Sequence, residues 1–216
     1  DGHVTHGWYI PIPESRGVVL YSHGNGGNIS GRMEGIAVWR NLGFDVLIYD
    51  YGGYGKSTGK ASEKRCYRDI RAMWRWLTEE QGIRSERIVL FGRSLGGVVA
   101  ADLAAEVTPG AVILGSTFLS AVKLGKEAFP FLPVNLLLRH RFETEDKIGS
   151  ITAPVLIVHS PGDDVVPYHH GEVLFQMAPE PKTFLQITGS HNDGYMQSSE
   201  HYLRGLRDFL EPLFPG

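Results

Sequence analysis

Short apolar runs alternate with longer segments of helical character along most of the chain, and this alternation constrains the fold most. The runs are nearly continuous Val, Ile and Leu, which is typical of strands buried on both faces of a sheet. We predict strands over Val18–Ser22, Phe44–Tyr49, Ile88–Phe91, Ala111–Leu114, Val155–His159 and Thr183–Ile187. We predict helices over Ile29–Leu42, Ser62–Gln81, Leu95–Glu106, Tyr168–Met177 and Gln197–Phe214. This order implies an α/β fold with a mostly parallel sheet and helices on both faces.

Two segments fall outside the alternation. Val4–Ile12 alternates apolar with polar residues and ends in prolines, so we predict an edge strand there. Residues 116–151 run for about 35 residues without a strand signal, which is too long for an ordinary connection. We therefore predict a short cap inserted at about 116–151, over the strand ends. The chain has 216 residues and shows no repeat or linker, so we expect a single domain over 1–216.

Charge and cysteine content exclude several classes of protein. The net charge of −3 provides no general attraction for nucleic acid. One cysteine, Cys66, can form neither an internal disulfide nor a cysteine zinc site. No apolar run reaches the 18 or so residues that cross a bilayer. The sequence opens at Asp1, so we expect a soluble domain as given, either cytoplasmic or attached to a membrane through a preceding segment; the compartment stays open.

A glycine-flanked serine follows the strand at 88–91, where residues 92–97 read GRSLGG. This is a G-x-S-x-G pattern between a predicted strand and a predicted helix. The strand-to-helix turn is too sharp for side chains beside the serine, and it strains the serine while exposing its hydroxyl. Five letters are a weak signal alone, but the flanking elements support Ser94 as a nucleophile.

A serine nucleophile needs a base, and the base needs an acid that orients it. In hydrolases of this architecture the chain order is Ser, then Asp or Glu, then His, each after a strand. Residues 160–164 read SPGDD and residues 188–193 read TGSHND, both after predicted strands. We predict Asp163 as the acid and His191 as the base for Ser94. Asp164 stays an alternative acid, and Asp193 an alternative local partner of His191.

Acyl transfer also needs donors for the developing oxyanion. One is the backbone N–H after the nucleophile, here that of Leu95, and the other comes from the loop after an early strand. That loop, residues 23–28, reads HGNGGN, and its glycines let backbone N–H groups converge. We predict Leu95 and Asn25 as the oxyanion donors, with His23 supporting the loop.

Five strings in this order, SHGNGGNIS, DYGGYGKS, FGRSLGG, HSPGDDVVP and GSHND, resemble the α/β-hydrolase superfamily. Within it they resemble compact serine hydrolases, often membrane-associated, that include esterases, lysophospholipases and protein depalmitoylating thioesterases. The resemblance runs from about His6 to the C-terminus. It implies the α/β-hydrolase fold, and the same nucleophile, acid, base and oxyanion donors. This branch commonly carries Arg where this chain has Gly52.

Other candidate sites have plainer interpretations. Lys64, Arg68, Arg71 and Arg75 share one helical face, which is typical of a solvated face; peripheral membrane association stays an open alternative. The string GKS at 55–57 resembles part of a phosphate-binding loop, but Asp50 stands where that pattern needs Gly. His169 and His170 come without zinc-ligand spacing, so we predict no metal site.

The cap holds the candidate acyl pocket. Its apolar side chains are either ordinary core or the wall of an acyl pocket. The candidates are Phe118, Phe129, Phe131 and Leu132.

These features predict a serine hydrolase that cleaves carboxylic esters of short to medium acyl chains through an acyl-enzyme intermediate. An acyl-protein or lipid thioesterase, or a lysophospholipase, is the alternative enzyme. A non-catalytic binding protein on the same fold is the alternative of another class. The chemistry requires no cofactor, and the expected partner is a small-molecule acyl ester; the oligomeric state stays open.

Overall fold

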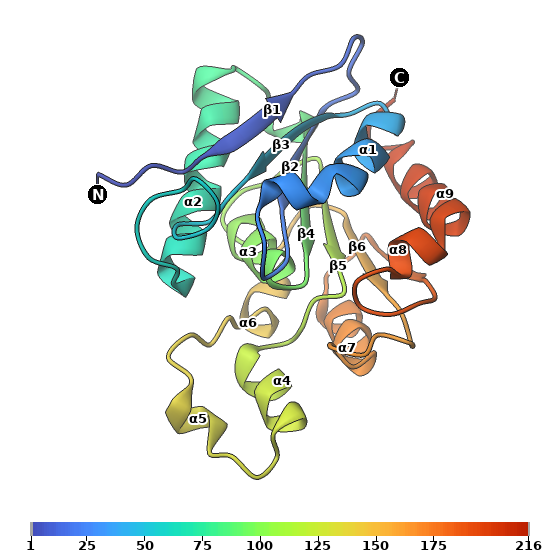
Figure 1. The fold of residues 1–216 in the computed structure, drawn as a ribbon. Helices are drawn as coiled ribbons and strands as arrows, with labels where there is room; N and C mark the ends of the chain where they lie inside the picture. The colour runs from blue at the N-terminus through green and yellow to red at the C-terminus, as the bar shows by residue number, and fades with distance from the viewer. Residues whose placement is uncertain (1, 216) are drawn as a thin grey trace.

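The computed structural model describes residues 2–215 and arranges them around one sheet (Figure 1). Within that range the sheet has seven strands in the order β1-β3-β2-β4-β5-β6-β7. The strands are β1 (Gly7–Ile10), β2 (Val18–Ser22), β3 (Asp45–Tyr49), β4 (Ile88–Arg93), β5 (Ala111–Gly115), β6 (Val155–His159) and β7 (Lys182–Gln186). β1 is antiparallel to β3, and every other pairing is parallel. This is the mostly parallel α/β sheet that the sequence predicts.

Helices cover both faces of the sheet. One face packs against α1 (Met33–Asn41) and α9 (Ser199–Leu210). The other packs against α2 (Glu63–Arg75), α3 (Leu95–Ala104) and α7 (His169–Met177). β2 illustrates the arrangement, since Val19 and Tyr21 join the first core while Val18 and Leu20 join the second. Burial on both faces explains why the strand sequences are continuously apolar.

Several element boundaries differ from the sequence prediction. The edge strand is confined to Gly7–Ile10 because Val4 pairs with the loop at Thr58 instead of with β3. The helix predicted over 29–42 begins as a 3-10 turn, Ile29–Arg32, before α1.

The helices at 62–81 and 197–214 are also divided. The first continues beyond α2 as a π turn, Trp76–Glu80, and a 3-10 turn, Ser85–Arg87, precedes β4. The last is preceded by the short α8 (Gly194–Gln197), and α9 ends at Leu210.

The turn at residues 50–55 is held by groups from α2. The backbone N–H of Gly52 donates to Asp69 Oδ2 at 2.7 Å, and Arg65 Nε donates to Asp69 Oδ1 at 2.8 Å. A Cβ on Gly52 would lie 2.5 Å from the Arg65 side chain. An arginine from α2 thus fills the space beside the turn, and only glycine fits opposite it.

Residues 116–151 are the segment predicted as a cap, and Leu119, Ile148 and Ile151 at its two ends belong to the core of the main body. The segment contains α4 (Ala121–Ala128), α5 (Val134–Leu137) and α6 (Glu145–Ile148) and no strand. In Figure 1, α4 and α5 project away from the sheet, below the carboxyl ends of β4 and β5. Among residues 2–215, no helix combines the length and apolar character needed to cross a membrane.

Candidate active site

Ser94 occupies the sharp turn between β4 and α3. Its φ of 53° and ψ of −121° lie outside the usual regions for a residue with a side chain. The turn is crowded: a Cβ on Gly96 would lie 1.9 Å from the carbonyl oxygen of Ser22, and one on Gly92 would lie 2.1 Å from that of Gly96. Gly92 and Gly96, the glycines on either side of Ser94, are therefore required by close backbone approach, as the sequence predicts.

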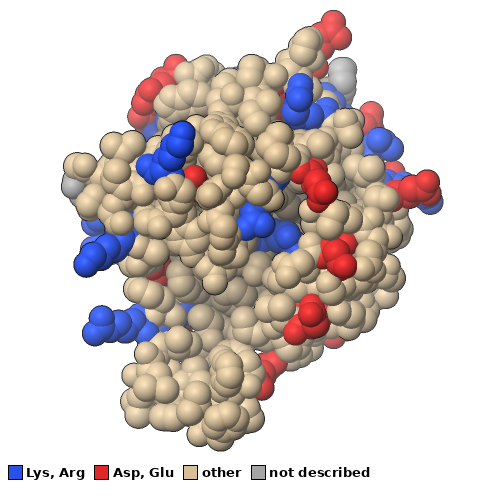
Figure 2. Space-filling view, viewed as in Figure 1, with Lys and Arg blue, Asp and Glu red and all other residues tan. Residues whose placement is uncertain are grey.

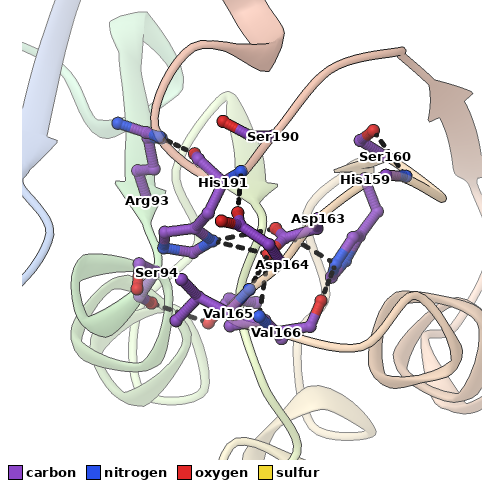
Figure 3. A network of polar contacts seen from close by, with 12 residues as sticks. Arg93, Ser94, His159, Ser160, Asp163, Asp164, Val165, Val166, Ser190 and His191 are labelled. Atoms are coloured by element: carbon purple, nitrogen blue, oxygen red, sulfur yellow. Dashed lines mark hydrogen bonds and ion pairs between the residues drawn. The ribbon is translucent and has the colours of Figure 1, made fainter.

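His191 and Asp163 are hydrogen-bonded to each other. Nδ1 of His191 lies 2.9 and 2.8 Å from the two carboxylate oxygens of Asp163 (Figure 3). Burial of Asp163 opposes its ionisation, but hydrogen bonds from His191 and from the N–H groups of Val166 and Val165 hold its pKa below the ordinary value. The carboxylate is thus kept charged against the imidazole.

Figure 3 shows the Ser94 side chain next to the His191 ring, on the side away from Asp163. The three predicted side chains therefore come together, from the ends of three different strands. The second ring nitrogen of His191, Nε2, lies on the Ser94 side. This arrangement can move a proton from a serine hydroxyl to a histidine whose tautomer is set by a carboxylate.

Asp164, the alternative acid, contacts the backbone of the same histidine instead of its ring. Its Oδ1 accepts the N–H of His191 at 2.9 Å. Arg93 donates to the carbonyl oxygen of His191, and its guanidinium carbon lies 5.2 Å from the ring centre of Tyr195. Ser160 joins the same loops by donating to the Gly189 carbonyl at 2.6 Å. Sequence reasoning missed these supporting roles, although the second Asp of SPGDD was a signal.

His159 lies behind Asp163 and is fully buried. Its Nε2 lies 2.9 Å from the Val166 carbonyl and 3.6 Å from Asp163 Oδ2. Burial lowers the pKa of His159 below the ordinary histidine value. A neutral His159 therefore borders the carboxylate without competing with His191 for the proton.

The glycine loop after β2 lies against Ser94. A Cβ on Gly24 would sit 3.5 Å from Ser94 Cβ, and Gly26 and Gly27 have φ of 83° and 65°. The Asn25 side chain accepts a hydrogen bond from the Tyr54 hydroxyl at 2.6 Å, which leaves its backbone N–H as the group that the prediction uses.

Leu95 is the other predicted oxyanion donor, and His23 is the residue predicted to support the loop. Leu95 begins α3, so its N–H has no acceptor within the helix. His23 Nδ1 lies 2.7 Å from the Gly24 carbonyl, and burial lowers the pKa of His23.

The predicted acyl-pocket residues divide into two groups. Phe118 is 6% exposed and packs with Val98 and Val166 at the base of the cap. Phe129, Phe131 and Leu132 are 52%, 80% and 42% exposed.

A small, partly open apolar pocket lies beside His191, on the face of the sheet that packs against α1 and α9. Aromatic side chains from several elements line it: Tyr21, Trp39, Phe91, Tyr195 and Tyr202. Tyr21 and Phe91 stand on β2 and β4 in the core shared with α1 and α9. The apolar residues that β2 and β4 direct toward α1 and α9 were the sequence signal for this pocket.

Glu127 of α4 faces both histidines at the start of α7. Its Oε1 lies 3.2 Å from His169 Nε2 and 3.4 Å from His170 Nε2, an arrangement with the dimensions of a metal site. The backbone N–H of Leu119, however, donates to His170 Nδ1 at 3.1 Å. Neutral His170 therefore carries its proton on Nε2, toward Glu127. This pattern favours a hydrogen-bonded link between the cap and α7 over metal ligation, because a metal would need an unprotonated Nε2.

The basic stripe of α2 includes a side chain with acidic partners. Arg71 donates to Asp102 at 2.7 Å and also bonds Glu106. Part of the stripe thus joins α2 to α3 and is not presented to a membrane.

The sheet, its crossovers and a serine at a strand-to-helix turn define the α/β-hydrolase class. The model of a hydrolase family described as serine aminopeptidase, S33, matches residues 13–143. An uncharacterised protein of Mycobacterium tuberculosis is 37% identical over 97% of this chain and 76% of its own length. Human alpha/beta hydrolase domain-containing protein 17B is 37% identical over 92% of this chain and 67% of its own length.

Among solved structures, an esterase from Pyrococcus furiosus superposes with a TM-score of 0.80 at 19% identity, covering 98% of this chain and 87% of that one. At that identity the likeness concerns the fold. The family match and the two relatives show that this chain belongs to the α/β-hydrolase family of serine hydrolases.

Proposed function

We propose that the chain hydrolyses carboxylic esters of short to medium acyl chains through an acyl-enzyme intermediate on Ser94. One observation carries the proposal: His191 Nδ1 is hydrogen-bonded to Asp163 at 2.8 Å while its ring adjoins the strained Ser94. A hydrogen bond at Nδ1 leaves Nε2 of a neutral imidazole as the acceptor for the serine proton.

The proposed reaction has two halves. Ser94 Oγ attacks the acyl carbon while its proton passes to His191 Nε2, and Asp163 stabilises the imidazolium. The N–H groups of Leu95 and Asn25 donate to the oxyanion. Collapse breaks the bond to the alcohol, which takes the proton from His191. Water then attacks the acyl-enzyme with the same base, and the acid leaves.

The test uses p-nitrophenyl esters of two to sixteen acyl carbons with the wild type and Ser94→Ala. We expect kcat/KM to fall by about 10⁴-fold or more in the variant, because the nucleophile is lost. A fluorophosphonate should label Ser94 in the wild type alone. Absence of both hydrolysis and labelling would favour the non-catalytic binding protein. A rise in kcat/KM beyond about twelve carbons would contradict the short-chain preference.

A second candidate is hydrolysis of long acyl chains, as thioesters or lysophospholipids, with peripheral membrane association. The exposed apolar side chains of the cap favour it. They are Phe129, Phe131, Leu132, Leu136, Leu137 and Leu138. In Figure 2 the lobe at the bottom, where Figure 1 places α4 and α5, is mostly uncharged on this face. Because these side chains are already exposed, they can cover a long alkyl chain without giving up core contacts.

Vesicles distinguish the two candidates. If the second is right, activity on a palmitoyl thioester should increase when phospholipid vesicles are added, and Phe131→Ser should remove the increase. Hydrolysis of the butanoyl ester should not change with either.

A further inference from the structure

Two arginines, Arg93 and Arg32, lie close to the same pair of tyrosines, Tyr21 and Tyr195, near the candidate site. Arg93 precedes Ser94 and lines the aromatic pocket beside His191, together with Ser116 and Ser190. Arg32 lies at the end of the 3-10 turn and donates to the Gly26 carbonyl of the candidate oxyanion loop at 2.6 Å. In Figure 2, Lys and Arg atoms lie within a hollow near the middle of this face.

Neither guanidinium group is neutralised by the protein. In residues 2–215, Arg93 bonds the His191 carbonyl and stacks on Tyr195, and no carboxylate lies within ion-pair distance of it or of Arg32. Nε of Arg32 is buried and has no hydrogen-bond partner. A guanidinium carries five N–H donors, so both groups retain unused donors.

The nearby carboxylates are committed to other partners. Asp163 binds the His191 ring, Asp164 the His191 backbone, and Asp193 the backbone and hydroxyl of Ser190. Glu34, at the rim, accepts the Tyr195 hydroxyl at 3.3 Å. The region therefore keeps two positive charges without direct compensation.

Both charges also act on the pocket tyrosines. Burial raises the pKa of Tyr21 and of Tyr195, while the positive charges of Arg93 and Arg32 lower it. An anion beside Tyr21 and Tyr195 would be attracted by the same two positive charges. A substrate amine would be repelled there, which disfavours release of residues with a free amino terminus.

The position of Arg93 indicates which part of the substrate it would contact. In the proposed reaction His191 protonates the leaving alcohol, so that alcohol must lie beside His191. Arg93 contacts His191 itself, and both residues line the aromatic pocket. Arg32 is held by the carbonyl of Gly26 in the candidate oxyanion loop.

Building on the proposed function, we propose that Arg32 and Arg93 bind an anionic group, phosphate or carboxylate, on the alcohol part of an acyl ester substrate. The preferred substrates are then esters such as monoacylated phosphate or carboxylate alcohols. Arginine suits this role because its planar donors match the oxygens of both anions.

Two pairs of esters test the preference. The carboxylate pair is 3-carboxy-4-nitrophenyl butanoate against 4-nitrophenyl butanoate, and the phosphate pair is 1-butanoylglycerol 3-phosphate against 1-butanoylglycerol. We expect kcat/KM to favour the charged member at least tenfold in one pair or both, which also identifies the anion. Arg32→Gln and Arg93→Gln should each reduce that ratio at least fivefold, whatever they do to the neutral ester. Arg40→Gln, an exposed arginine at the far end of α1, should leave the ratio unchanged.

A binding measurement keeps the test independent of turnover. Phenyl phosphate is titrated into Ser94→Ala protein by calorimetry, with benzyl alcohol as its neutral counterpart. We expect phenyl phosphate to bind and benzyl alcohol not to bind. The affinity for phenyl phosphate should fall at least tenfold when Arg32→Gln or Arg93→Gln is added to the Ser94→Ala protein. It should be unchanged when Arg40→Gln is added. Equal rates within both ester pairs, or equal ratios in all variants, would overturn the inference while leaving ester hydrolysis intact. If no ester is hydrolysed, the proposed function fails, and the titration alone decides whether the two arginines bind an anion.

Discussion

The loops around Ser94 and the cap lie side by side in the fold but are built differently. Around Ser94, glycines allow backbone contacts that no side chain would permit, and Asp163 and His191 are hydrogen-bonded to each other across two strand-end loops. In the cap, α5 leaves Leu136 and Leu137 exposed, at 85% and 61%. The proposed chemistry therefore depends on positions with almost no spatial freedom, whereas the exposed surface of the cap can change at little cost in stability.

The largest effect should come from the two neighbouring aspartates. Asp163→Asn should lower kcat/KM on 4-nitrophenyl butanoate by about 10⁴-fold, because an amide no longer holds the required tautomer of His191. Asp164→Asn should lower it about tenfold or less, since an amide oxygen can still accept the His191 backbone N–H. Equal losses would show that the two carboxylates do not have the separate roles that the contacts indicate.

The next largest effects should come from two glycine substitutions, one beside Ser94 and one in the cap. Gly96→Ala should lower the free energy of unfolding by more than about 3 kcal/mol, because its Cβ would meet the Ser22 carbonyl at 1.9 Å. Gly149→Ala, just after α6, should change it by less than about 0.5 kcal/mol, since nothing lies within 4 Å of that Cβ. Urea unfolding measures both. A stable Gly96→Ala protein would mean that the turn can relax more than close packing allows.

Two of the phenylalanines of the cap, Phe118 and Phe131, should separate burial from exposure. Phe118→Ala should cost about 3 kcal/mol of unfolding free energy, because Phe118 packs against Val98 and Val166. Phe131→Ala should cost less than about 0.5 kcal/mol, because Phe131 is 80% exposed. Chemical denaturation of both variants is the measurement. A large loss in Phe131→Ala would place the α4–α5 connection against the body in solution.

The smallest effect concerns pH. Burial lowers the pKa of His159 in the folded protein, so below about 6.5 the unfolded chain binds a proton that the folded chain does not. Stability should therefore fall as the pH drops from about 6.5 toward the lowered pKa. His159→Gln should reduce that slope by up to about 1.4 kcal/mol per pH unit, measured by urea unfolding at several pH values.

The pH effect has an internal control. Asp163 has a lowered pKa, so its contribution is complete above the ordinary carboxyl pKa and is lost only as the pH falls further, through the lowered value. An unchanged slope in His159→Gln above pH 5 would mean that His159 is not held neutral.

The strand pattern and the GRSLGG string predicted much of what positions the site. Continuous apolar runs reveal buried parallel strands, and all the loops after such strands meet at one edge of the sheet. Helix ends were less predictable, because a π turn after Arg75 and a 3-10 turn before Met33 depend on packing. The cap's length was readable from the sequence, but the exposure of Phe131 was not, since an apolar residue looks the same inside and outside.

The sequence by itself determined the fold class and the strand ends that carry Ser94, Asp163 and His191, because periodicity and local turn chemistry are written in neighbouring residues. Only the tertiary structure decided that Asp163 contacts the ring and Asp164 the backbone of His191, and that, within residues 2–215, Arg93 and Arg32 bond backbone carbonyls and no carboxylate. Such contacts join residues far apart in the chain, and their distances depend on how the strand-end loops pack together. A pattern along the sequence contains no measure of those distances.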